Sequence, residues 1–187
     1  VHIGTTNTMI TLHRGNLLEA RAEAIVNTVN TVGVMGKGIA LQFKQAFPKN
    51  FKIYERACKH DEVRIGQMLV VPMLDHPRYI INFPTKRHWR AKSKIEDIEA
   101  GLAALVENVR DLGIRSIAVP PLGCGNGGLD WNDVRPLIEA AFAAVPDVEV
   151  ELYEPTGAPA ARSMPVAPKQ LKMTAGRAAV VALLKNY

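Results

Sequence analysis

Two stretches of this chain share one order of features: an apolar run, a glycine-rich loop and the start of a helix. The first is VNTVNTVGVMGKGIALQF (residues 26–43), and the second is VPPLGCGNGGLDW (residues 119–131). Short apolar runs bounded by turn residues are typical of buried strands, so each loop is expected to leave a strand. Glycines cost backbone entropy, and several in one loop indicate that the backbone approaches something closely.

The rest of the chain also alternates between strand and helix patterns, which predicts a three-layer α/β/α sandwich with a mixed, mostly parallel central sheet. Asn50 is expected to cap the second helix, and Ser93 with Glu96 forms a capping box for a long helix that ends before Gly113. Strands are expected at 9–13, 24–29, 67–72, 78–83, 116–119 and 148–153, and helices at 37–47, 50–59, 93–112 and 132–145.

Length and composition favour one domain with a short appendage. The chain has 187 residues, of which 48% are hydrophobic, and we expect a folded domain at 9–154. A Pro/Ala-rich linker follows at 155–173, and residues 174–187 are predicted to form a short basic helix, the start of a truncated C-terminal region. All acidic residues precede residue 155 while five basic residues follow it, so the net charge of +5 comes from the tail.

Composition also limits the cofactor and the compartment. No apolar run approaches the roughly 20 residues that cross a bilayer. The two cysteines, Cys58 and Cys124, have no metal-binding or redox spacing, which suits a reducing cytosol. We therefore expect a cytoplasmic monomer without a cofactor, a metal or a membrane contact.

The two loops predict a site for an anionic ligand. In an open α/β sheet, ligands bind outside the carboxyl ends of the strands, where loop N–H groups and helix N-termini hold anionic oxygens. Neither loop has the P-loop or the Rossmann pattern. Tight turns alone would explain one such loop, but two together favour a diphosphate. Asn27 is expected to cap loop backbone, whereas Asn30 either does the same or binds ligand hydroxyls.

A third stretch, INFPTKRHWRAKSK (residues 81–94), combines cations with rings. Phosphates on the cations and bases on Trp89 and His88 would suit a single nucleic-acid strand, with Arg87 and Arg90 as further contacts. The alternative is a solvated basic loop. Lys86 differs from the other cations because it comes directly off a strand end, where the ligand site is expected.

These stretches resemble the macrodomain family, which binds ADP-ribose. The resemblance rests on GNLLEARAEAIVNTVNTVGVMGKGIA and PPLGCGNGGLDW, and it covers about residues 9–154. Within macrodomains, MGKGIALQFKQAFP, the lysine after PT, and GCG followed by W resemble the terminal-ADP-ribose glycohydrolase branch. They are still more similar to the DarG family, antitoxins that remove ADP-ribose from thymidine in single-stranded DNA modified by the toxin DarT.

The resemblance implies a role for each matching residue. Asn16 and Leu17 would lie at the adenine end, Asn30 at the distal ribose, and Lys86 would be the catalytic residue beside the anomeric carbon, aided by Asn30. A DarT-like toxin would be the partner, mainly through the C-terminal region. The other implied ligand contacts are Thr28, Val29, Gly38, Ile39, Ala40, Gln42, His88, Leu122, Gly123, Cys124, Gly125, Asn126 and Gly127.

Two positions depart from the family pattern. Asn16 replaces the aspartate that usually reads adenine, and Gly127 stands where the protein-deacylating branch has a catalytic aspartate. Asp130, three positions on, is expected to cap the next helix. Lys86 would therefore act largely alone, either as a cation that protonates the departing base or as a neutral amine that attacks the sugar. A non-catalytic ADP-ribose reader and a hydrolase of protein-linked ADP-ribose are the alternative functions.

Overall fold

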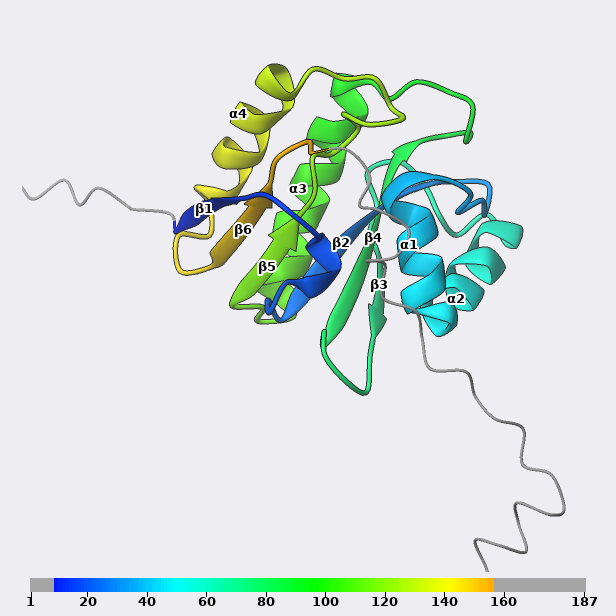
Figure 1. Cartoon of the computed structure of the whole chain (residues 1–187), viewed down its shortest axis with the longest axis horizontal. Coiled ribbons are helices and arrows are strands. Elements are labelled where there is room, and N and C mark those ends of the chain that lie inside the picture. The colour runs from blue at the N-terminus through cyan, green and yellow to red at the C-terminus, as the bar shows by residue number, and fades with distance from the viewer. Residues whose placement is uncertain (1–8, 157–187) are drawn as a thin grey trace, which may run out of the picture.

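The computed structural model describes residues 9–156, and these contain one six-stranded sheet flanked by helices (Figure 1). The strands lie in the order β1-β6-β5-β2-β4-β3, and every pair is parallel except β3 with β4. The elements are β1 (Ile10–His13), a 3-10 turn η1 (Leu17–Glu19), β2 (Ala24–Asn30), α1 (Gly38–Ala46), α2 (Pro48–Lys59), β3 (Leu69–Pro72), β4 (Tyr79–Lys86), α3 (Ile95–Asp111), β5 (Ser116–Val119), α4 (Trp131–Phe142) and β6 (Glu149–Tyr153).

Adjacent residues of β2 face the two helical layers. Val26 packs in the core formed with α3 and α4, whereas Ile25 packs with Phe43 of α1 on the other face of the sheet. Successive strand side chains point to opposite faces, so strands buried on both sides are apolar at most positions. α1 and α2 lie on one side of the sheet and α3 and α4 on the other (Figure 1), which confirms the predicted three-layer sandwich.

Two predicted caps are wrong. α2 begins at Pro48, which favours the first helical position, and Asn50 is buried inside the helix. α3 begins at Ile95 with Lys94 as its N-cap and without a capping side chain, so Ser93 and Glu96 form no capping box. The backbone N–H of Ser93 instead bonds the carbonyl of Gly127 at 3.0 Å, which turns this residue toward the second glycine loop.

Residue 156 is the last one that the structure describes, so expectations for the residues after it are not addressed by the fold. Within residues 9–156, no helix is both long and apolar enough to cross a membrane. Most of the expected linker and all of the expected basic helix lie outside the described residues.

Candidate functional site

The main cavity opens at the carboxyl ends of β2, β4 and β5, between the two glycine-rich loops. Its volume is about 890 Å³, within the range of small-molecule sites. It is lined by 15–17, 28–30, Val34, 36–40, Gln42, Thr85, Lys86, Trp89, Arg90, Pro120, Pro121, Gly123, 125–127 and 153–156. The topology thus brings the two loops and Lys86 to one site, as the sequence predicts.

Asn30 shapes the first glycine loop. Its Oδ1 accepts hydrogen bonds from the backbone N–H groups of Val32 and Val34, at 3.0 and 3.3 Å, and its Nδ2 donates to the carbonyl of Val34 at 2.6 Å. The hydroxyl of Tyr54 in α2 donates to the carbonyl of Asn30 at 2.8 Å. Asn30 thereby holds the loop in shape and also lines the main cavity.

Asn27 does not cap loop backbone, contrary to expectation. Its Nδ2 donates to Oδ1 of Asn82 at 3.0 Å, and Asn82 also exchanges hydrogen bonds with Asn50 in α2. All three side chains are buried. Because an unpaired buried amide is costly, each asparagine takes its partner from a neighbouring element. The cluster joins β2, β4 and α2 beneath the first loop.

The second glycine loop is compact. Gly123 has φ of +72°, a conformation that side chains rarely adopt. Gly127 has no room for a β-carbon, which would collide with the carbonyl of Gly123 and the hydroxyl of Ser93. An aspartate at 127 is therefore sterically excluded in this loop. Asp130 accepts from the N–H of Asn132 at 2.8 Å and caps α4, as expected.

A bulge places Lys86 in the site. Val29 pairs with Pro84 but Asn30 pairs with Lys86, so Thr85 is an extra residue in β4. Bulges often redirect side chains beside functional sites. Nζ of Lys86 lies 3.5 Å from the carbonyl of Asn126 in the second loop.

The surroundings of Lys86 lower the pKa of its amine. Partial burial lowers the pKa of this amine below its ordinary value, and the charge of Lys92 lowers that pKa further. Within residues 9–156, no carboxylate forms an ion pair with it. Lys92, which also lies in the stretch 81–94, is the cation that lowers this pKa.

The basic–aromatic segment, residues 86–94, has two kinds of side chain. Trp89 and Arg90 line the main cavity, and the guanidinium of Arg90 lies 4.4 Å from the indole centroid. His88 stacks on Trp89 at 5.4 Å but does not line the cavity. Arg87 makes a paired contact with Asp97 of α3, at 2.6 and 3.1 Å. Arg87 is thus tied to α3, and its contact with DNA stays a prediction.

Two more predicted residues of the second loop lie outside the cavity lining. Leu122 is fully buried in the core with α3 and α4. Cys124 packs against that core, and burial, with a smaller effect of Asp130, raises the pKa of its thiol to about 11. A thiol with a raised pKa is a weak nucleophile near neutral pH.

Sequence reasoning missed one wall of the cavity. Tyr153, Glu154, Pro155 and Thr156 line it from the end of β6. Glu154 pairs with Arg14 at 2.6 Å. β6 is two strands from β2 in the sheet. No local sequence pattern predicts the strand order that brings the end of β6 to the cavity. Lys37 of the first loop and Gly15 were also missed.

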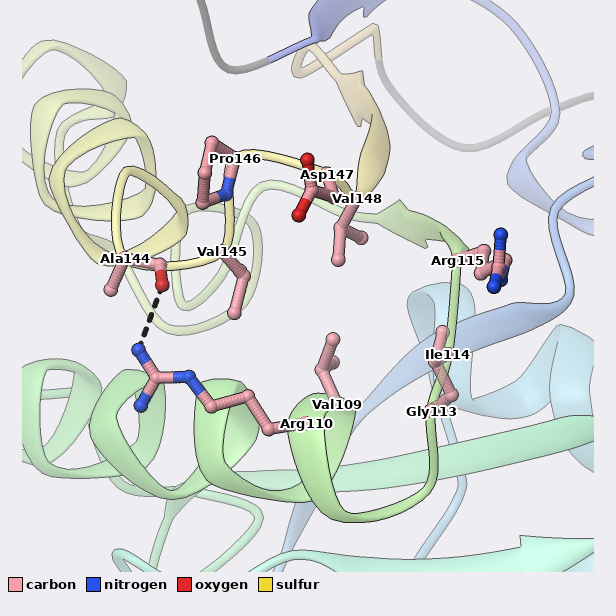
Figure 2. Close-up of a pocket in the computed structure, with 10 residues that line it drawn as sticks. All are labelled: Val109, Arg110, Gly113, Ile114, Arg115, Ala144, Val145, Pro146, Asp147 and Val148. Carbon is pink, nitrogen blue, oxygen red and sulfur yellow. Dashed lines mark hydrogen bonds between the residues drawn. The ribbon is translucent and has the colours of Figure 1, made fainter. Parts of the chain in front are cut away.

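A second cavity of about 630 Å³ lies at the opposite end of the strands, next to the residues that precede β5 and β6 (Figure 2). Val109, Val145 and Val148 line it, and Arg110 bridges α3 to the carbonyl of Ala144 at 2.7 Å. None of the sequence-predicted site residues lines this cavity.

Comparison with known proteins identifies the fold family. The family model described as Macro domain matches residues 26–138, more than half of the chain. The chain belongs to the macrodomain family. This macrodomain is similar to a protein of Mycobacterium tuberculosis named DNA ADP-ribosyl glycohydrolase, with 54% identity over 96% of this chain and 51% of the relative. The chain thus spans about half the length of the curated relatives it matches.

Solved structures agree with this assignment. The macrodomain of M. tuberculosis DarG matches with a TM-score of 0.78 and 58% identity, covering 80% of this chain and 100% of that one. Thermosipho africanus DarTG in complex with ADP-ribose matches with a TM-score of 0.76 and 36% identity, covering 81% of this chain and 43% of that one. The macrodomain described here is therefore similar to the DarG macrodomains.

Proposed function

We propose that this macrodomain removes ADP-ribose from ADP-ribosylated thymidine in single-stranded DNA and so reverses the action of a DarT-type toxin. The observation that carries the proposal is the partly buried amine of Lys86, set between the two glycine loops without a carboxylate partner in residues 9–156. A protein that only binds ADP-ribose has no need for such an amine at the reacting carbon. Similarity to proteins named DNA ADP-ribosyl glycohydrolase supports the choice of DNA as substrate.

The proposed ligand lies along the main cavity. ADP-ribose places its adenine toward Asn16, Leu17 and the wall formed by 153–156. Its diphosphate rests on the N–H groups of the two glycine loops, and its distal ribose lies near Asn30 and Lys86. The side-chain amide of Asn16 already bonds Leu18 and Glu19, at 3.1 and 3.3 Å. Adenine is then held more by the shape of this wall than by a dedicated carboxylate.

Two routes for Lys86 follow from its surroundings. In the covalent route, the neutral amine attacks the anomeric carbon, the bond to the base nitrogen breaks, and the base leaves with that electron pair and takes a proton. Ring opening gives a lysine imine, which water hydrolyses to ADP-ribose and the free amine. In the acid route, the ammonium form protonates the departing base and water attacks the sugar. The lowered pKa of Lys86 increases the share of neutral amine that the covalent route needs.

The proposed DNA contact is the part of the basic–aromatic segment that faces the cavity. Trp89 is 41% exposed and lies beside Arg90 at the cavity mouth. An exposed ring next to a guanidinium suits a base and its phosphate. We further propose that the protein acts in the cytoplasm and meets a DarT-like toxin mainly through a C-terminal region that begins beyond residue 173.

One comparison tests this function. The protein is incubated with single-stranded DNA ADP-ribosylated on thymidine and with a peptide that carries ADP-ribose on glutamate, and released ADP-ribose is measured by chromatography. We expect release from the DNA and little from the peptide, because the second loop has no room for an acid at Gly127. Binding of ADP-ribose without release from either substrate would mean that the protein binds ADP-ribose but does not hydrolyse it. Faster release from the peptide would contradict the choice of substrate.

A further inference from the structure

Three consecutive residues of the second glycine loop are contacted by the last residue of β4 and by the residues that follow it. Nζ of Lys86 reaches the carbonyl of Asn126 at 3.5 Å, and the N–H of Ser93 bonds the carbonyl of Gly127 at 3.0 Å. The side chain of Lys92 covers Gly128 so closely that Nζ would touch a β-carbon there. Two lysine amines therefore approach the same three-residue stretch, Lys86 from the cavity and Lys92 beside it.

The contact of Ser93 fastens this arrangement. Ser93 is only 6% exposed, and its hydroxyl lies against Gly123 and Gly127 without a hydrogen-bond partner among the described residues. Because the backbone of Ser93 is hydrogen-bonded to this loop, the backbone of the neighbouring Lys92 lies close to the loop as well. The amine of Lys92 lies beside Gly128, and its side chain is exposed to solvent.

We propose that Lys92 is a positioning residue of the proposed hydrolase, whose charge beside the second glycine loop keeps the amine of Lys86 free to attack the sugar. This inference rests on the proposed function and adds a residue to it. A neighbouring cation disfavours the charged form of an amine, and a catalytic lysine beside a second cationic group is a known way to activate it. The lowered pKa of Lys86, due first to burial and then to Lys92, agrees with the geometry.

The other charged groups around Lys86 do not replace Lys92. Lys37 of the first loop, Arg90 and Glu154 line the same cavity, and Glu154 is paired with Arg14. Arg87 is paired with Asp97 of α3, and Asp130 caps α4 beyond the second loop. Among these groups, Lys92 is the one whose charge shifts the titration of Lys86.

The test measures the titration of Lys86 directly and independently of catalysis. Lysines are reductively methylated with ¹³C-formaldehyde, and the methyl resonance of Lys86, assigned by its loss in Lys86→Ala, is followed by NMR against pH. In Lys92→Met we expect the midpoint of Lys86 to rise by about half a unit, the order of magnitude for two like charges that interact through a largely aqueous medium. Lys92→Arg should keep the wild-type midpoint. Lys94→Met is the matched control and should also leave it unchanged.

Two further readouts separate this role from simple loop packing. If the neutral amine attacks, kcat/KM rises with pH through the Lys86 titration, so Lys92→Met should lose about threefold activity below the midpoint and recover at higher pH. Added salt should raise the midpoint in wild type and have less effect in Lys92→Met, because salt screens the exposed charge. An unchanged Lys86 midpoint in Lys92→Met, or an equal loss of activity at every pH, would refute this role. Absence of ADP-ribose release by the wild-type enzyme would refute the function itself.

Discussion

Arg87 and Asp97 form a two-pronged ion pair that ties the basic–aromatic segment to the first turn of α3. The carboxylate is largely buried while the guanidinium stays exposed. This geometry is the strong form of an arginine–carboxylate contact. It commits Arg87 to holding the segment in place, and it leaves Trp89 and Arg90 to face the main cavity.

The first prediction compares these two arginines in DNA binding. Removing a cation that contacts a phosphate lowers the salt dependence of binding, by about 0.7 in the logarithmic slope for a single strand. We expect Arg90→Gln to show that decrease for an ADP-ribosylated oligonucleotide, measured by fluorescence anisotropy. Arg87→Gln should keep the wild-type slope and lower the thermal midpoint instead. A reduced slope in Arg87→Gln alone would reverse the two assignments.

The second prediction concerns the catalytic amine. Lys86→Ala should abolish release of ADP-ribose from DNA but change its affinity for free ADP-ribose by no more than a few fold, because most ligand contacts lie elsewhere. Lys86→Arg should be inactive as well, since arginine keeps the charge but does not deprotonate. Borohydride reduction during turnover should leave a stable adduct on Lys86, detected by mass spectrometry. Near-normal turnover by Lys86→Arg would show that the residue supplies only charge.

The third prediction uses two glycines of the same loop. Gly127 has no space for a β-carbon, whereas nothing lies within 4 Å of a β-carbon at Gly125. We expect Gly127→Ala to weaken ADP-ribose binding at least tenfold in calorimetry, because the loop must shift to admit the methyl group. Gly125→Ala meets no such collision within the protein, so it should weaken binding less than Gly127→Ala. Equal affinities for the two variants would mean that the loop geometry does not set the diphosphate site.

The fourth prediction concerns the buried asparagine cluster. Asn82 pairs with Asn27 and Asn50 and also donates to the carbonyl of Leu69 at 3.2 Å. Asn82→Ala leaves these buried groups without partners, so the free energy of unfolding should fall by about 3 kcal/mol. Asn108→Ala, which removes one contact on the half-buried face of α3, should cost much less. Urea denaturation of both variants measures the difference.

Much of this protein follows from local sequence. The strand patterns predict six strands near their observed positions because strands buried on both faces form nearly continuous apolar runs. The glycines of both loops indicate a close approach of backbone to ligand, since the conformation at Gly123 is one that side chains rarely adopt. Lys86 stands out in the sequence because it comes directly after a strand, at the edge where parallel strands place a ligand.

Other features depend on which distant elements meet. Asn50 and Ser93 have the local character of helix caps. In the fold, however, Asn50 is buried and forms two hydrogen bonds with the amide of Asn82, and the backbone N–H of Ser93 bonds the carbonyl of Gly127. Residues 153–156 line the cavity because the strand order places the end of β6 near it. Lys92 lowers the pKa of Lys86 because the chain after β4 packs against the second glycine loop. Turn conformation and the ends of strands depend mainly on neighbouring residues, so the sequence determined the two glycine loops and the place of Lys86 at a strand end. The partners of a side chain depend on long-range packing. The tertiary structure alone therefore decided the surroundings that lower the pKa of Lys86.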